Sequence, residues 1–304
     1  MSKHLDCLGL GISPLDILVG IGNYPPVGSK IDGTGLTIQG GGPVPNAMVA
    51  LSRLGMKTAV IIPVGDDLFG QLLVEELKRE GISVSYVVRK KQPTALATGW
   101  IERGSGSRTI VLNRQINLTP GDIKLRDLPA TRMVHLDGRD IAACLKLANW
   151  AGREKITVSF DIGSIRNDIS AILPLTDHLV CADAFALPYT GSSEPRTAIE
   201  KLKGICPGTI VVTSGTNGSI GYDKISGYVR QRAFKVKSID TTGAGDTFHG
   251  GYLFGLLKGW DLKKRLRFAS AAAAIKCTRP GARTGIPNYR QVISFLNRSG
   301  GRYA

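Results

Sequence analysis

Short apolar runs alternate along the chain with longer segments whose apolar residues recur every three to four positions. The runs have the length of buried strands, and the recurring spacing is typical of helices packed on one side. The strand-like runs are 5–10, 57–64, 133–136, 156–160, 178–181 and 209–213, and the helical patterns between them are 46–54, 68–80, 141–151 and 195–203. This alternation predicts an α/β fold, with a doubly wound, mostly parallel central sheet flanked by helices.

Two regions, about 15–38 and 84–113, depart from the alternation. They contain short strand-like stretches bounded by glycine and proline turns, so we expect them to form a small β-sheet lid inserted in the main fold. The last third of the chain is predicted to be helical, over 244–258, 262–276 and 289–297. We expect a single domain over residues 1–304.

The composition narrows the class of protein. The chain has 304 residues, 42% of them apolar, which is enough for a sizeable core. Its five cysteines include no CxxC pair. This favours a reducing compartment and argues against a zinc site. The N-terminus shows no signal-peptide pattern, and no apolar run reaches the ~18 residues that would span a membrane. We therefore expect a cytoplasmic protein without a membrane partner.

The formal net charge of +15 raises the question of nucleic acid. The lysines and arginines are spread along the chain, whereas a nucleic-acid binder more often has a basic tail or one basic helix face. We expect no nucleic-acid partner. A basic field of this kind would attract an anionic small molecule.

The segment 240–248, with the sequence DTTGAGDTF, carries the strongest chemical signal. Gly243 and Gly245 leave the backbone free to turn its N–H groups toward one point, and an apolar helical pattern follows. The start of that helix is an anion site. Asp246 would repel a bound phosphate, so we expect it to remove a proton from a hydroxyl that attacks a phosphoryl group. The alternative is that Asp246 is only a helix N-cap.

A second glycine run, Gly40 to Gly42, also precedes a helical pattern. Asn46 at the start of that helix offers both a donor and an acceptor, which suits sugar hydroxyls. The sequence contains neither a GxGxxG fingerprint nor a Gly-Lys dipeptide, so dinucleotide and Walker A loops are excluded. The alternative for this run is a plain tight turn.

Together the two glycine elements resemble the ribokinase-like (PfkB) family of sugar kinases. Gly41, Gly42 and Asn46 match the family's GGxxxN motif, and 240–246 matches its DTxGAGD motif. Further likeness lies in 11–16, 65–70 and 212–218. The resemblance spans nearly the whole chain and implies the ribokinase-like fold and an ATP-dependent kinase that uses Mg²⁺.

The resemblance also implies roles for single residues. Asp246 resembles the catalytic base, and the backbone of Gly243, Ala244 and Gly245 resembles the anion hole around the transferring phosphoryl group. The positions that match sugar-binding residues are Asp16, Gly41, Gly42 and Asn46. Those that match the surroundings of the nucleotide are Thr213, Gly215, Gly218, Gly243 and Gly245. Asp240 and Thr242 fall where some members bind a monovalent cation such as K⁺. The alternatives are a turn residue for Asp16 and a loop acid for Asp240.

One family feature is missing. The usual NxxE motif, tied to the magnesium–phosphate network, has Ala182 and Phe185 in place of its two polar residues. Magnesium could still be held by nucleotide phosphates and water. The change removes the expected protein ligands to the metal.

The substrate is less determined. The stretch 271–287 resembles a branch that includes sulfofructose kinases and relatives of ketohexokinase, in which Lys30, Asn113 and Arg139 would reach the anionic end of the sugar. The alternative is that Lys30 and Arg139 are surface charges. The expected reaction is phosphorylation of a primary hydroxyl of a ketose or an anionic ketose derivative. A nucleoside kinase, with Trp100 stacking on the base, and a non-catalytic sugar or nucleotide sensor remain as alternatives. By resemblance, the lid could also pair two subunits into a homodimer.

Overall fold

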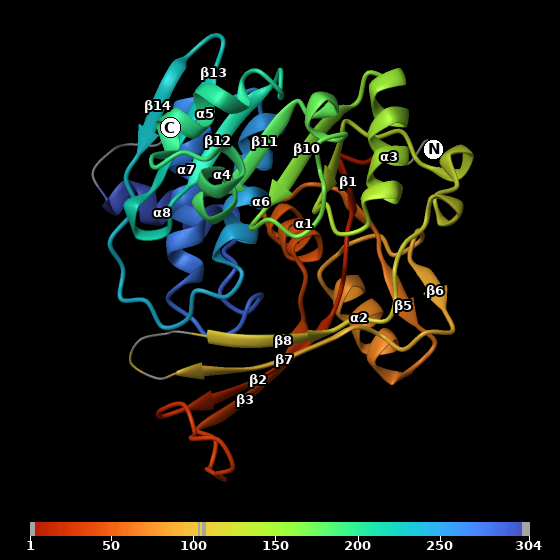
Figure 1. The fold of residues 1–304 in the computed structure, drawn as a ribbon, viewed down its shortest axis with the longest axis vertical. Helices are drawn as coiled ribbons and strands as arrows, with labels where there is room; N and C mark the ends of the chain where they lie inside the picture. The colour runs from red at the N-terminus through yellow and green to blue at the C-terminus, as the bar shows by residue number, and fades with distance from the viewer. Residues whose placement is uncertain (1–3, 103, 105–107, 300–304) are drawn as a thin grey trace.

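The computed structural model describes residues 4–102, 104 and 108–299 and centres on a twisted eight-stranded sheet (Figure 1). Its strand order is β14-β13-β12-β11-β10-β9-β1-β4. Neighbouring strands from β4 to β12 are parallel, and β13 and β14 add an antiparallel hairpin at one edge. The strands are β1 (Cys7–Leu10), β4 (Thr58–Ile61), β9 (Met133–Leu136), β10 (Thr157–Ile162), β11 (His178–Ala182), β12 (Thr209–Thr213), β13 (Ser219–Asp223) and β14 (Gly227–Gln231).

Helices cover both faces of this sheet because its strands are apolar on both sides. In β12, Val211 packs into one core cluster while Ile210 and Val212 pack into the other, as the two-residue period of a strand requires. The first cluster receives residues of α1 (Pro43–Arg53), α2 (Leu68–Arg79), α6 (Ala244–Leu257), α7 (Leu262–Lys276) and α8 (Tyr289–Arg298). The second receives residues of α3 (Ile141–Arg153), α4 (Asp183–Thr190) and α5 (Pro195–Leu202). The expected doubly wound α/β architecture is confirmed.

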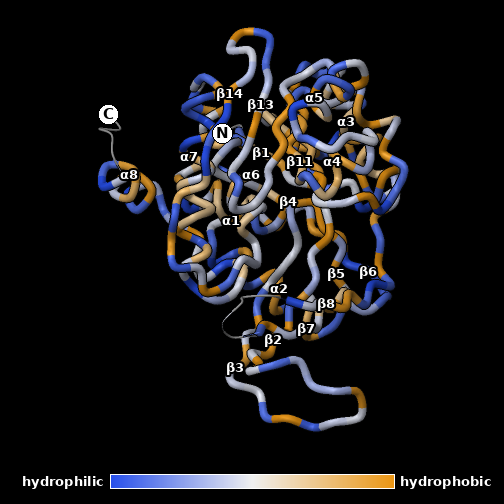
Figure 2. The backbone as a smooth tube through the Cα atoms, turned by 60° about the vertical axis from the view of Figure 1, so that its left-hand side comes forward, coloured by the Kyte–Doolittle hydropathy of each residue, from blue (hydrophilic) through white to orange (hydrophobic). Residues whose placement is uncertain are grey.

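A separate four-stranded sheet projects from the main body (Figure 1), in the order β3-β2-β7-β8. It consists of β2 (Leu15–Ile21), β3 (Gly35–Gly40), β7 (Leu96–Glu102) and β8 (Arg108–Asn113). The long loop between β2 and β3 extends beyond this sheet, away from the body of the molecule (Figure 2). The strands lie largely inside the two segments that the sequence marks as a lid, although β3 continues to Gly40.

The second of those segments contributes strands to two different sheets. β6 (Val88–Lys90) pairs with β5 (Pro63–Gly65) in a two-stranded sheet of its own, so residues before β7 do not belong to the four-stranded sheet. The predicted strand over 57–64 is likewise split between β4 and β5. The remaining regular elements are the short 3₁₀ helices Pro120–Asp122, Leu125–Asp127, Leu173–Leu175 and Gly215–Asn217. Among the helices of the described ranges, none has both the length and the apolarity that crossing a bilayer requires.

Candidate active site

The helix α6 starts where the glycines of the 240–248 segment predict. Its N-cap is Gly243, whose φ of 74° is left-handed. A Cβ at this position would also come within 2.9 Å of the Ala282 carbonyl oxygen, so both conformation and space demand glycine. Asp246 lies in the first turn of the helix. The N-cap is therefore Gly243, and the interpretation of Asp246 as only an N-cap is wrong.

Asp246 is held by a residue 200 positions away in the chain. The side-chain amide of Asn46, in the first turn of α1, donates to Asp246 Oδ2 at 2.7 Å. Burial raises the pKa of Asp246 to about 6, with the nearby charge of Asp161 adding to the shift and the Asn46 hydrogen bond opposing it. A carboxylate with this pKa is ionised at neutral pH and is a better proton acceptor than an exposed aspartate.

Asp16 lies beside this pair, on β2. Burial raises its pKa to about 7, the charge of Arg283 lowers it, and the negative charge of Asp246 raises it further. The glycine run allows this approach, since a Cβ on Gly41 would lie 2.1 Å from Asp16 Oδ1. Gly42 has a φ of 95°, and a Cβ there would meet the Ile12 carbonyl oxygen at 2.2 Å. The run is thus more than a tight turn, because its bare backbone makes room for the Asp16 carboxylate.

Arg283 connects several of these residues through its guanidinium group. The sequence pattern contained no signal for its role. Its side chain is buried and donates through Nε to Asn46 Oδ1 at 2.8 Å. Its Nη1 pairs with Glu76 Oε1 at 3.1 Å, and the other carboxylate oxygen of Glu76 accepts from the Gly40 amide at 2.6 Å. Because Arg283 can only donate, the Asn46 amide must turn its oxygen to Arg283 and its NH₂ to Asp246.

A pocket of about 260 Å³ opens at the carboxyl ends of β9 and β10. This is the edge where parallel α/β sheets bind ligands. Asp16, Asn46 and Asp246 are not among its lining residues, but Asp161, whose charge acts on Asp246, is. The pocket wall combines the cations Arg108, Arg139 and Arg166 with the carboxylates Asp137 and Asp161. Burial, and then the positive charge of Arg166, lower the pKa of Arg139, so the guanidinium groups lie close enough to repel one another. A pocket with crowded cations favours an anionic ligand.

Asp137 is a second site residue that the sequence analysis did not single out. Its carboxylate accepts from the amides of Ile12 at 2.9 Å and Arg139 at 3.1 Å. Burial nevertheless raises its pKa to about 7. Asp16, Asp137 and Asp246 are therefore three carboxylates that carry a desolvation cost, as expected where hydroxyl groups of a ligand are to be bound.

The predicted substrate residues separate into two sets. Arg139 lines the pocket, and Pro43 of its wall directly follows Gly42. Arg108 reaches from β8 to the 240–248 segment, where its Nη1 donates to Thr241 Oγ1 at 3.2 Å. Lys30 lies exposed in the loop after β2, and Asn113 is exposed at the end of β8; neither lines the pocket.

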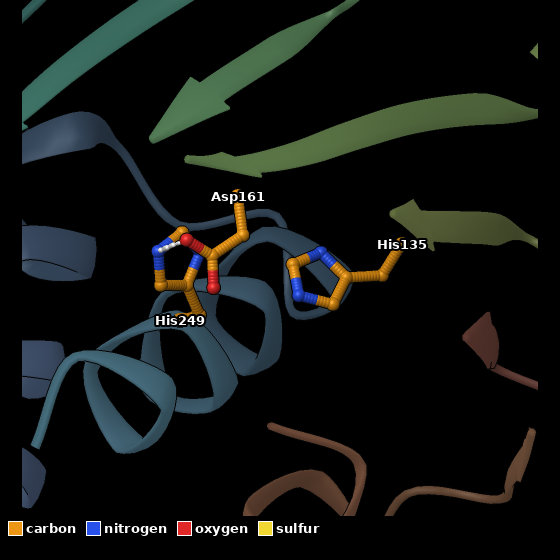
Figure 3. A group of neighbouring side chains, drawn as sticks. All are labelled: His135, Asp161 and His249. Carbon is orange, nitrogen blue, oxygen red and sulfur yellow. Dashed lines mark ion pairs between the residues drawn. The ribbon is translucent and has the colours of Figure 1, made fainter. Parts of the chain in front are cut away.

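Three buried side chains gather from β9, β10 and α6: His135, Asp161 and His249 (Figure 3). Asp161 and His249 are near enough to Asp246 for their charges to act on it. His249 Nε2 pairs with Asp161 Oδ1 at 3.1 Å, and His135 Nδ1 lies 3.2 Å from Ser159 Oγ. These are zinc-ligand types, and their ligand atoms lie within 4.8 Å of one another. In a tetrahedral zinc site with bond lengths of about 2.1 Å, the ligand atoms lie roughly 3.4 Å from one another. In this structure Asp161 holds His249, about one turn after Asp246 on α6, and the His135 ring packs against the His249 ring with centroids 5.5 Å apart.

The predicted nucleotide residues lie farther along the same sheet edge. Thr213 ends β12, Gly215 opens the following 3₁₀ turn with a φ of 52°, and Gly218 has a φ of 90°. A Cβ on Gly218 would lie 2.1 Å from the Gln231 carbonyl oxygen, so this glycine lets the end of β14 lie close to the chain just before β13. Thr213 Oγ1 is engaged with the Cys181 carbonyl oxygen at 3.3 Å.

The altered NxxE positions flank the start of α4. Ala182 is its N-cap and makes no side-chain hydrogen bond. Phe185 is buried, stacks on Tyr189 at 4.8 Å between ring centroids and lines the 260 Å³ pocket. These two positions therefore offer an apolar wall and no metal ligand.

The chain is similar to known carbohydrate kinases over most of its length. Residues 20–288 match the pfkB family of carbohydrate kinases. The ribokinase of Bacillus subtilis (strain 168) is 28% identical over 297 residues, which cover 95% of this chain and 98% of the relative. The 5-dehydro-2-deoxygluconokinase of Geobacillus thermodenitrificans (strain NG80-2) is 24% identical over 286 residues, covering 84% and 83%.

Among solved structures, the ribokinase of Thermotoga maritima superposes with a TM-score of 0.83 at 25% identity, over 96% of this chain and 99% of that one. The expected likeness to the sulfofructose kinase and ketohexokinase branch is not confirmed, since these relatives are ribokinases and a 5-dehydro-2-deoxygluconokinase. The chain belongs to the pfkB family of carbohydrate kinases, with the ribokinase-like fold, and is an ATP-dependent sugar kinase.

Proposed function

We propose that this kinase transfers the γ-phosphoryl group of ATP to a primary hydroxyl of a small anionic sugar derivative, with Asp246 as general base. The observation that carries the proposal is the setting of Asp246. Its carboxylate has a pKa raised by burial to about 6, it is oriented by Asn46, and it lies in the first turn of a helix that begins at a left-handed glycine.

The transfer follows from this geometry. Asp246 accepts the proton of the sugar hydroxyl as the oxygen forms its bond to the γ-phosphorus. The bond from that phosphorus to the bridging oxygen of ADP breaks in the same displacement. The amides of Gly243 and Gly245 at the start of α6 stabilise the negative charge of the phosphoryl group, and each such donor is worth about 10²–10³ in rate. The Ala244 amide donates to the Thr241 carbonyl oxygen at 3.1 Å, so it would have to leave that bond to take part. Asp16 and Asn46 hold and orient the sugar.

ATP brings Mg²⁺, which neutralises phosphate charge when it is bound. Ala182 and Phe185 provide no ligand for it, so we propose that phosphate oxygens and water hold the ion. The four-stranded sheet closes the site against water, which would otherwise accept the phosphoryl group. The contact from Arg108 to Thr241 joins this sheet to the α6 loop and supports the lid role.

The anionic character of the substrate rests on Arg108, Arg139 and Arg166 around the pocket. A guanidinium can grip a carboxylate, phosphate or sulfonate with two parallel hydrogen bonds. We therefore propose that Arg139, Arg108 and Arg166 bind the anionic group. The sequence analysis did not select Arg108 and Arg166. Lys30 would need the loop that carries it to move before it could take part.

The register of the four-stranded sheet argues against the alternative that the protein is a nucleoside kinase. Trp100 pairs with Val19, and Asp16 pairs with Ala97. Positions 16 and 19 point to opposite faces of a strand, so Trp100 lies on the face away from Asp16. It therefore cannot stack on a base held beside Asp16 without a change of register. The sensor alternative is disfavoured by the intact Asp246 and its anion hole.

That outer face also supports a homodimer through the lid. Leu36, Ile38, Trp100 and Val111 share it by register and are 64%, 55%, 40% and 58% exposed. Exposed apolar side chains that share one face of a sheet are typical of a protein interface. We propose that two copies of the chain pair through it.

The test is release of ADP from Mg-ATP against a panel of sugars with Asp246→Asn alongside. The panel contains ribose, fructose, fructose 1-phosphate, fructose 6-phosphate, tagatose 6-phosphate, sulfofructose, 5-dehydro-2-deoxygluconate, 2-keto-3-deoxygluconate and adenosine. We expect turnover on an anionic sugar that falls by about 10²–10⁴ in Asp246→Asn. Turnover that persists in the variant would remove Asp246 as the base, and preference for adenosine would favour the nucleoside kinase.

A further inference from the structure

A buried lysine lies beneath the anion hole. Lys276 ends α7, and its side chain is 0% exposed. Its Nζ donates to the backbone carbonyl oxygen of Asp240 at 2.8 Å. Burial lowers the pKa of this ammonium, while the negative charges of Asp240 and Asp246 act in the opposite direction. Lysine is almost never fully buried unless its charge is compensated, so this placement calls for a role.

The ammonium joins two segments that shape the anion hole. Asp240 begins the 240–248 segment, and its two carboxylate oxygens accept from the amides of Thr242 and Gly281, each at 2.7 Å. The Cys277 carbonyl oxygen accepts from the Ile239 amide at 2.8 Å. Lys276 thus lies where hydrogen bonds join the segment after α7 to the loop that leads into Gly243.

A monovalent cation at Asp240 and Thr242 was expected from resemblance, and these residues do not fit one here. Both carboxylate oxygens of Asp240 accept backbone N–H groups, and its carbonyl accepts Lys276. Of the oxygens that the two side chains and the Asp240 carbonyl offer, only Thr242 Oγ1 has no partner among the described residues. An alkali ion needs several oxygens in place of its hydration shell, and it would be repelled by the ammonium beside it.

We propose that the Lys276 ammonium takes the place of the monovalent cation, so that this kinase works without potassium. The lysine acts as a positioning residue. It holds the Asp240 carbonyl and thereby the loop that aims the Gly243–Gly245 amides, and it adds fixed positive charge on the side where phosphoryl charge develops. Because the cation is covalently tethered, the site does not depend on the ion concentration in solution.

The experiment compares wild type, Lys276→Ala and Lys276→Met, with Lys263→Ala as the control because Lys263 is exposed on the same helix. Sugar phosphorylation and thermal unfolding are both measured in choline, potassium, ammonium and methylammonium chloride at equal ionic strength. We expect the wild-type kcat to vary by less than about twofold among the salts. In choline, kcat of Lys276→Ala should fall roughly 10–100-fold with little change in KM for ATP.

Small cations should partly restore kcat of Lys276→Ala and raise its unfolding temperature, while leaving the wild type and Lys263→Ala unchanged. A wild type that requires potassium, or a Lys276→Met variant with full activity in choline, would overturn the proposal. Should both variants fail to fold, the salt dependence of the wild type decides the question alone. The kinetic arm rests on the proposed phosphoryl transfer. The unfolding arm needs no sugar, so failure of the proposed function and failure of this inference are distinguishable.

Discussion

Asn46 donates its side-chain NH₂ to Asp246 at 2.7 Å while its oxygen accepts from Arg283 at 2.8 Å, so one amide joins the base to a buried cation. The base lies on α6, the amide on α1 and the cation in the loop after α7. The glycine run before α1 and the glycines before α6 therefore meet at a single hydrogen-bonded group. The orientation of Asp246 depends on all three segments.

Arg283→Met should damage both stability and catalysis. The substitution leaves Glu76 without its cation and frees the Asn46 amide to rotate. Removing one partner of a buried ion pair costs about 3–5 kcal/mol of the free energy of unfolding, and the site would lose further rate because Asp246 is no longer oriented. Chemical denaturation and kcat measure the two effects. Arg290→Met, at an exposed position on α8, is the control and should leave both within error of wild type.

Activity should decline on the acid side of neutrality. Asp246 must be ionised to accept a proton, and its pKa is raised to about 6, so kcat/KM should be at its plateau above that value and fall as the pH drops through it. The neighbouring Asp16, with a pKa raised to about 7, spreads the transition upward. A pH–rate profile that stays flat down to pH ~4, where an ordinary aspartate titrates, would contradict this assignment.

Asp16→Asn should stabilise the fold at alkaline pH while impairing sugar binding. The folded-state pKa of Asp16 lies above the ordinary value of 3.8, so the folded state holds the proton more tightly than the unfolded chain. Stability from this group is fully present below pH ~4 and is lost as the pH rises through about 7. The neutral amide removes that loss, worth roughly 2–4 kcal/mol at pH 8. Thermal unfolding at pH 4 and pH 8 tests this, with the exposed Asp127→Asn as control.

Arg139→Ala should discriminate between charged and neutral sugars. If the guanidinium grips an anionic group, kcat/KM for a phosphorylated, sulfonated or carboxylated sugar falls roughly 10–100-fold, since hydrogen bonds to charged groups contribute about 1.5–3 kcal/mol. The rate on a neutral sugar should change little. Arg153→Ala, at the exposed end of α3, serves as control. Equal losses on both sugar classes would assign Arg139 a structural role.

Ile38→Asp should separate the proposed dimer into monomers. The substitution places a charge on the apolar outer face of the lid, where burial at an interface would leave it unpaired. Light scattering after size-exclusion chromatography gives the mass of the particle. Ile225→Asp, at a 98% exposed position between β13 and β14, is the matched control. A wild-type chain that is already monomeric at all concentrations would exclude the lid dimer.

The sequence by itself determined the architecture and the centre of the chemistry. Short apolar runs and helical segments with a period near 3.6 are local properties, so they predicted six strands of the central sheet and four of the helices between them to within a few residues, although α4 was missed. Gly243 and Asp246 were also identified locally, because a glycine that must adopt a left-handed φ and a helix start both leave marks in adjacent residues. The hairpin β13–β14 was missed because its strands are only partly buried, so glycine and polar residues interrupt their apolar pattern.

Only the tertiary structure decided which distant groups meet. Arg283, Asp137, His249 and Lys276 carry no local mark of their function. Their roles come from burial and from partners on other elements, which sequence spacing does not encode. The same holds for Lys30 and Trp100, whose residue types suggested a site that their positions do not reach. A side chain's charge and reach are written in the sequence, but its desolvation and its partners exist only once the chain is packed.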